Sequence, residues 1–156
     1  MNTKVHFSSQ RLDWQTPKAV YNALDAEFHF NFDPCPHNPD FDGLSIRWKT
    51  SNFVNPPYGR EIGRRLKKGY EESLLGKTVV FLIPSRTDTR RWHDYVMKAK
   101  EIRFIKWRLK FGSATNSAPF PNAIVIFRKD KNVYREPKNK RQWYTLCYTA
   151  KRKMPE

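Results

Sequence analysis

Apolar residues recur every three to four positions in three stretches of the chain, which is the spacing of one helix face. The pattern predicts helices over residues 17–27, 62–74 and 92–99. Thr16 followed by Pro17 is typical of a helix start, because threonine caps helices and proline is tolerated at the first helical position. We therefore expect three amphipathic helices that cover a core with one face each.

Apolar runs of strand length lie between and after these helices. Residues 78–83 form a continuous, largely β-branched run, which is typical of a strand buried on both faces. Phe28, Phe30 and Phe32 alternate with polar residues and predict a strand that ends at Asp33. Shorter candidate strands cover residues 53–54, 102–105, 123–127 and 144–148. The alternation of helices and strands predicts an α/β fold with a mostly parallel sheet and helices on both faces.

Charge is distributed unevenly over the 156 residues, which carry a formal net charge of +15. Residues 1–59 hold 5 basic and 6 acidic side chains, residues 60–127 hold 15 and 6, and residues 128–156 hold 10 and 3. Such a one-sided excess points to a polyanionic partner, most simply nucleic acid. We expect phosphate contacts from basic side chains that begin just beyond residue 59, namely Arg60, Arg64, Arg86, Arg90, Arg108 and Lys110.

Other features of the composition exclude several classes of protein. Two cysteines, Cys35 and Cys147, are too few for a disulfide-rich secreted scaffold, so a reduced cytoplasm is expected. The longest apolar run, residues 79–83, is too short to span a bilayer, and no apolar signal segment opens the chain. Cys35 and His37 lack the further ligands of a zinc site. We expect no metal and no membrane, and a monomer is favoured.

The segment with the most specific chemistry is Asn55-Pro56-Pro57-Tyr58, between a predicted strand and a predicted helix. Ligands of open α/β sheets bind at the carboxyl ends of strands, which is where this quartet lies. The Asn55 side-chain oxygen and the Pro56 carbonyl can both accept hydrogen bonds from a flat NH2 group, and Tyr58 offers a ring for stacking. An exocyclic amine of a nucleobase fits this description, provided that the base is flipped out of its duplex.

With these motifs the chain resembles the small, phage-type DNA adenine-N6 methyltransferases, which depend on S-adenosylmethionine. In that family Asn-Pro-Pro-Tyr is the catalytic motif. The resemblance covers about residues 14–127 and keeps the order of motifs. The matching segments are Trp14-Gln15-Thr16-Pro17, Phe32-Asp33-Pro34-Cys35, the catalytic quartet, residues 82–89, residues 103–111 and residues 119–127.

The resemblance implies a site-specific adenine methyltransferase with a reduced Rossmann-like class I sheet, mostly parallel with an antiparallel final strand. It implies catalytic roles for Asn55, Pro56, Pro57 and Tyr58, and cofactor contacts by Trp14, Thr16, Pro17, Asp33, Pro34 and Cys35. We expect a polar arm over residues 1–13, a methyltransferase domain over 14–128 and a basic extension over 129–156, which could add one strand. Double-stranded DNA in the cytoplasm of a bacterial host is the expected substrate, with a phage or prophage as the source of the gene.

Departures from the family pattern leave alternatives open. No glycine-rich loop follows Asp33, so the residue that holds the cofactor ribose is open, with Asp42 as a candidate. Arg65, Arg91 and Trp107 stand where the family pattern has Trp, Trp and Gly, and their effect on activity is open. The alternatives are an RNA methyltransferase of the same fold and a non-catalytic DNA-binding module. The sequence does not specify a recognition site or a biological role.

Overall fold

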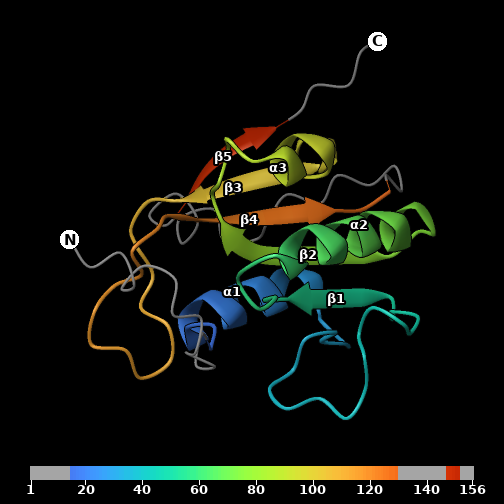
Figure 1. Ribbon diagram of the computed structural model, residues 1–156, viewed down its shortest axis with the longest axis horizontal. Helices are drawn as coiled ribbons and strands as arrows, with labels where there is room; N and C mark the ends of the chain where they lie inside the picture. The colour runs from blue at the N-terminus through green and yellow to red at the C-terminus, as the bar shows by residue number, and fades with distance from the viewer. Residues whose placement is uncertain (1–14, 130–146, 152–156) are drawn as a thin grey trace.

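A computed structural model describes residues 15–129 and 147–151, which form a mixed α/β fold around one five-stranded sheet (Figure 1). The third predicted helix is split at Tyr95 into a short α-helix and a 3-10 helix. In the predicted final strand, residues 144–146 lie outside the described residues. The elements are α1 (Lys18–Phe28), β1 (Ser51–Val54), α2 (Glu61–Leu74), β2 (Thr78–Pro84), α3 (Arg90–Asp94), η2 (Val96–Lys98), β3 (Glu101–Ile105), β4 (Asn122–Phe127) and β5 (Cys147–Lys151).

The strands follow the order β1-β2-β4-β3-β5 across the sheet. Strands β1 and β2 pair in parallel, β4 runs antiparallel to both β2 and β3, and β5 runs antiparallel to β3. Strands β1, β2 and β3 therefore point in the same direction, toward the left in Figure 1. We call the edge at which these three strands end the carboxyl edge.

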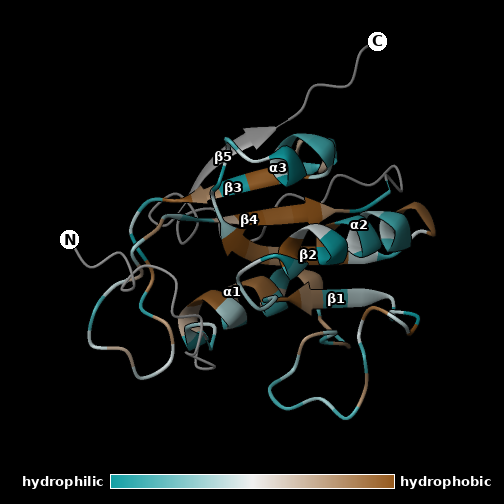
Figure 2. Ribbon diagram, viewed as in Figure 1, coloured by the Kyte–Doolittle hydropathy of each residue, from teal (hydrophilic) through white to brown (hydrophobic). Residues whose placement is uncertain are grey.

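Apolar cores cover both faces of the sheet. On β2, Val79 and Phe81 pack into the core beneath α2 and α3, whereas Val80 and Leu82 pack into the core beneath α1. Figure 2 shows the resulting pattern, with β2 and β4 brown and much of α2 teal. Helix α2 lies so close to the sheet that a Cβ added at Gly69 would come within 2.4 Å of a ring carbon of Phe81. The prediction of helices on both faces is confirmed.

The prediction of a mostly parallel sheet is correct at one end only. Parallel pairing is found between β1 and β2, and at an isolated bridge from Phe32 to Asn52. The expected antiparallel final strand is present as β5, but β4 is also antiparallel and lies inside the sheet. The cause is the connection between β3 and β4, because residues 106–121 contain no helix and the chain returns antiparallel to β3.

The predicted strand at Phe28, Phe30 and Phe32 is wrong in its first half. Phe28 is the last residue of α1, and His29 then turns the chain with a positive φ of 50°. The rings of Phe28 and Phe30 lie 6.0 Å apart and pack with the same core, so the alternation reflects an aromatic cluster rather than two faces of a strand. Phe32 makes a single parallel bridge, to Asn52 of β1.

Candidate active site

The Asn-Pro-Pro-Tyr quartet leaves the sheet at the carboxyl edge, directly after β1. Strand β1 is buried along its whole length, so Asn55 emerges from a fixed position. Pro56 is buried and Pro57 is exposed, and neither has an N–H with which to continue the ladder. Gly59 then turns the chain toward α2 with a φ of 153°. The predicted placement of the quartet between a strand and a helix is confirmed.

Asn55 connects the quartet to the chain segment that precedes α1. Its side-chain amide donates a hydrogen bond of 3.1 Å to the hydroxyl of Thr16, which is 39 positions away in the sequence. The backbone carbonyl of Gln15 accepts from the amide of Gly112, at 3.0 Å. The structure thus brings Thr16 and Pro17, two of the predicted cofactor residues, to the Asn-Pro-Pro-Tyr quartet. Trp14, the third from this segment, lies outside the described residues.

Tyr58 is held by side chains that lie much later in the sequence, within residues 111–122. Its ring makes edge contacts with Phe111 and Phe120, with centroids 5.9 Å and 5.4 Å away. The amide of Asn122, the first residue of β4, donates to the Tyr58 hydroxyl at 3.3 Å. Burial raises the pKa of the Tyr58 phenol, although the Asn122 hydrogen bond acts in the opposite direction. Tyr58 therefore stays uncharged and is suited to stacking rather than to accepting a proton.

Two buried polar atoms beside the quartet have no hydrogen-bond partner among the described residues. They are the side-chain oxygen of Asn122 and the hydroxyl of Ser85. Ser85 follows β2, and its amide donates to the Pro121 carbonyl at 2.9 Å, so both atoms lie at the carboxyl edge. Buried polar groups without partners are costly, which makes these atoms candidates to bind a polar ligand. Neither was predicted as a site residue, although Ser85 lies two positions after the predicted strand 78–83 and Asn122 immediately precedes the predicted strand 123–127.

Asp33, Pro34 and Cys35 reach the same edge next to β1. The amide of Phe53 donates to the carbonyl of Phe32 at 3.1 Å, so the chain runs parallel to β1 just before Asp33. One carboxylate oxygen of Asp33 accepts from the Cys35 amide at 2.7 Å. Desolvation raises the pKa of the Asp33 carboxyl, while this hydrogen bond and the charge of Arg65 act to lower it. Burial raises the pKa of the Cys35 thiol to about 12, so the thiol stays protonated.

The coil over residues 33–50 is kept in place by a few close contacts. A Cβ added at Gly43 would lie only 2.0 Å from the Pro34 carbonyl oxygen, so the backbone passes where no other residue fits. The Trp48 indole N–H donates to the Gly43 carbonyl at 2.6 Å, and Arg65 donates to the Pro34 carbonyl at 3.4 Å. In the sequence, Arg65 stands out only as a departure from the family pattern. The structure shows that it supports the coil.

Asp42, the candidate for the cofactor ribose, uses its carboxylate within the coil. One carboxylate oxygen accepts from the Leu44 amide at 2.9 Å, and the Asp42 carbonyl accepts from Ser45. This is the arrangement of a local turn, in which an Asp side chain substitutes for a backbone acceptor. The described contacts of Asp42 thus account for a structural role.

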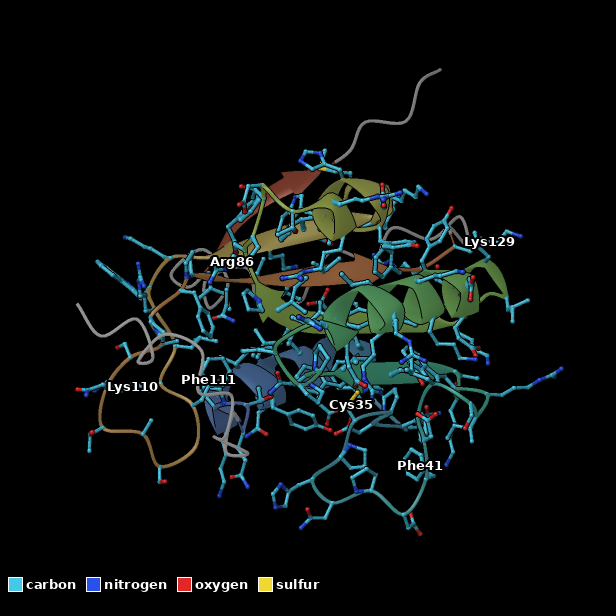
Figure 3. The ribbon with its side chains drawn as sticks, in the orientation of Figure 1. Cys35, Phe41, Arg86, Lys110, Phe111 and Lys129 are labelled. Atoms are coloured by element: carbon cyan, nitrogen blue, oxygen red, sulfur yellow. The ribbon has the colours of Figure 1, made fainter. Side chains whose placement is uncertain are left out.

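The six basic side chains predicted to contact phosphate are all exposed. Arg86 follows β2, and Arg108 and Lys110 follow β3, so these three extend from the carboxyl edge. Figure 3 shows Arg86 and Lys110 on the same side of the molecule as Phe111. Arg60 and Arg64 lie at the start of α2, and Arg90 on α3 forms an exposed ion pair with Asp94 at 3.2 Å. Arg60, Arg86, Arg108 and Lys110 thus lie on segments that leave the carboxyl edge.

Two features, a candidate metal site and a candidate membrane span, are absent from residues 15–129 and the backbone of 147–151. No group of three or more His, Cys, Asp or Glu side chains is placed to hold a metal ion. None of the described helices combines the length and the apolar character needed to cross a membrane.

Comparison with known proteins shows which family the chain belongs to. The model of a family described as DNA N-6-adenine-methyltransferase (Dam) matches residues 3–145. The chain belongs to this family. A curated relative from Haemophilus phage HP1 (strain HP1c1), named DNA N-6-adenine-methyltransferase, is 29% identical over 133 residues. The match covers 73% of this chain and 77% of the relative. The resemblance inferred from the order of the motifs is confirmed.

The three residues that depart from the Dam-family pattern lie at different places in the fold. Arg65 packs beneath the coil over residues 33–50, and Arg91 is partly buried on α3. Burial lowers the pKa of the Arg91 guanidinium, and the nearby charge of Arg86 adds to this effect. Trp107 lies exposed in the turn after β3.

Proposed function

We propose that the protein transfers a methyl group from S-adenosylmethionine to the N6 amine of an adenine that is flipped out of DNA. The observation that carries the proposal is the position of the Dam-family quartet. It stands at the carboxyl edge after a buried strand, in hydrogen-bond contact with Thr16 and next to Asp33, Pro34 and Cys35. Both reactants would therefore meet at one place on a rigid sheet.

The chain's own groups account for activation of the amine. The lone pair of the adenine N6 is delocalised into the ring, so the amine is a poor nucleophile. Two acceptors, the Asn55 side-chain oxygen and the Pro56 carbonyl, would bind its two N–H groups and favour a tetrahedral nitrogen with its lone pair restored. Tyr58, held by Phe111 and Phe120, would stack on the base. Fixing two reactants in this geometry can supply about 7–11 kcal/mol.

The residues that would hold the cofactor fit its chemistry. Bound S-adenosylmethionine supplies an electrophilic methyl group on a cationic sulfonium, and its methionine part carries an ammonium group. Asp33 offers a carboxylate of opposite charge at the carboxyl edge, beside Pro34 and close to the end of β1. Cys35 stays protonated because its pKa is raised to about 12, and so it does not compete for the methyl group as a thiolate. Trp14, Thr16 and Pro17 would complete the set of residues that contact the cofactor.

The fold supports this assignment. Three strands of one direction, with an antiparallel strand inserted between the second and third, form a reduced class I methyltransferase sheet in our interpretation. Residues 14–128 would be the catalytic domain, residues 1–13 an arm, and residues 129–156 an extension that contributes β5. The exposed arginines and Lys110 would contact phosphates of double-stranded DNA. The protein would act as a monomer on DNA in the host cytoplasm.

A nucleoside analysis tests the proposal directly. Purified protein is incubated with methyl-labelled S-adenosylmethionine and duplexes of varied sequence, and the digested DNA is examined for N6-methyladenine by mass spectrometry. We expect labelled N6-methyladenine from duplex DNA and much less product when RNA of the same sequence is supplied. A folded sample that binds cofactor but yields no N6-methyladenine in any duplex would refute the proposed activity. Preferential methylation of RNA would instead favour the RNA methyltransferase alternative.

A further inference from the structure

Trp107 is an exposed aromatic side chain in a basic turn. It is 69% exposed, whereas Trp48 and Trp92, the other two tryptophans among the described residues, are 2% and 4% exposed. A buried Trp removes about 150–250 Å² from water, at roughly 25 cal/mol per Å². The fold therefore buries two indoles and leaves the third in solvent, where it adds little to stability.

The neighbours of Trp107 suit a polyanion. Lys106, Arg108 and Lys110 flank it and are all exposed. The Lys106 ammonium lies 5.2 Å from the indole centroid, so one part of the ring contacts a cation and the rest meets solvent. An exposed flat ring among basic residues is the combination by which proteins stack on bases while they bind the phosphate backbone.

The turn that carries Trp107 is attached to the candidate active site. It follows β3 at the carboxyl edge, and the same loop contributes Phe111 and Phe120 to the packing around Tyr58. Phe111 is four positions after Trp107, so their Cα atoms are at most about 14 Å apart. At 3.4 Å per nucleotide this distance is about four steps along a DNA strand. Trp107 is thus within reach of the bases that flank a flipped adenine.

We propose that Trp107 stacks on a DNA base near the target adenine, while the basic residues beside it bind the adjoining phosphates. The inference rests on the proposed function and adds a base contact that supports the distorted duplex. Base flipping breaks stacking, and an inserted or stacked aromatic side chain offsets part of that cost. The contact is made through the ring face and not through an ion pair, so it is separable from phosphate binding by its salt dependence.

The test measures duplex binding by fluorescence anisotropy over a range of salt concentrations, with S-adenosylhomocysteine present. We expect Trp107→Ala to weaken binding roughly 5- to 150-fold, since stacking contributes about 1–3 kcal/mol per base. Trp107→Phe, which keeps a ring face, should stay much closer to the wild type. The slope of log K against log salt should be unchanged in Trp107→Ala, whereas Arg108→Ala should reduce it by about 0.9, the value for one lost phosphate contact.

A matched control replaces Leu75, which is 73% exposed and follows α2 at the opposite edge of the sheet. Leu75→Ala should bind DNA as the wild type does. Unchanged binding to the duplex in Trp107→Ala would overturn the inference. Wild-type N6-methyladenine formation is measured in the same series, so that failure of the inference is distinguishable from failure of the proposed function.

Discussion

The candidate site has a proposed target side and a proposed cofactor side, which are built in different ways. The target side consists of the quartet over residues 55–58 with Phe111, Phe120 and Asn122, and each member follows a strand, begins one or packs on a ring. The cofactor side consists of Thr16, Pro17 and the coil over residues 33–50, which contains no helix or strand. The target side derives its rigidity from the sheet, whereas the cofactor side depends on a few contacts across the coil.

This difference predicts that substitutions on the two sides have different effects. Substitutions on the target side should change the reaction without loosening the fold, because buried strands hold the backbone there. Substitutions at the contacts that hold the coil should affect stability and cofactor binding together, because no regular hydrogen-bond ladder replaces them. Substitutions at five positions test this contrast, namely Asn55, Glu72, Gly43, Tyr58 and Asn122.

Asn55→Ala should have the largest effect. It removes an acceptor that acts on the amine in the transition state, so we expect kcat to fall by about 10²–10³ or more, as for loss of a transition-state hydrogen bond elsewhere. DNA affinity and melting temperature should change little. Asn55→Asp is the matched variant, because it keeps an acceptor oxygen and loses the donor to Thr16. Normal methylation by Asn55→Ala would show that the amine is activated elsewhere.

Glu72→Gln should lower stability through the cofactor side. Glu72 is buried on α2, forms ion pairs with Lys68 at 2.9 Å and with Lys77, and accepts from the Trp48 amide. Breaking such charged hydrogen bonds costs about 2–3 kcal/mol, which corresponds to roughly 4–12 °C in melting temperature for a chain of this size. Glu71→Gln is the control, because the Glu71 carboxylate is exposed and lies 3.9 Å from Lys67. A fall of the same size in both variants would contradict a special role for Glu72.

The effect of Glu72 should also depend on pH. Burial alone would raise its pKa, but hydrogen bonds from Lys77 and Lys68 outweigh burial and lower it. A carboxyl whose pKa is lowered by folding stabilises the fold above its unfolded pKa of about 4.3, and this stability is lost as the pH falls through the folded value. The difference in melting temperature between wild type and Glu72→Gln should therefore be full at pH 7 and shrink below about pH 4.3.

Gly43→Ala should weaken cofactor binding more than DNA binding. The new Cβ would lie 2.0 Å from the Pro34 carbonyl, so the segment that carries Asp33 and Cys35 must move. Overpacking of this kind costs about 1–3 kcal/mol, to be read from calorimetric titration with S-adenosylhomocysteine and from thermal unfolding. Gly63→Ala is the control, because its Cβ would make an ordinary contact of 3.7 Å with Arg91. Equal cofactor affinity in both variants would show that Pro34 is not part of the cofactor side.

The same contrast explains what could be predicted from the sequence. The helices, most strands and the quartet are encoded by neighbouring residues, whose spacing and turn chemistry are visible in a single chain. The inserted position of β4 and the single bridge at Phe32 depend on pairing between distant segments. The roles of Gly43 and Asn122 depend on residues that are distant in the sequence: Gly43 passes close to the Pro34 carbonyl, and Asn122 reaches Tyr58 across 64 positions. Such residues carry no local sequence signal, so the contacts that hold the two sides in place could not be predicted from the sequence.

The smallest expected effect concerns the hydrogen bond between Asn122 and Tyr58. Tyr58→Phe keeps the ring and its contacts with Phe111 and Phe120 but removes the hydroxyl that accepts from Asn122. One neutral hydrogen bond contributes about 0.5–1.5 kcal/mol, so we expect kcat/KM for DNA to fall roughly 2- to 13-fold in Tyr58→Phe and in Asn122→Ala.

The double variant distinguishes a shared role from two separate ones. If Asn122 acts by orienting Tyr58, the two losses should not add, because the second substitution removes a bond that is already broken. The pH profile of kcat should be the same in Tyr58→Phe as in the wild type up to about pH 10, because burial raises the pKa of Tyr58 above its ordinary value of about 10. Additive losses would instead assign the buried Asn122 oxygen a contact of its own with the base.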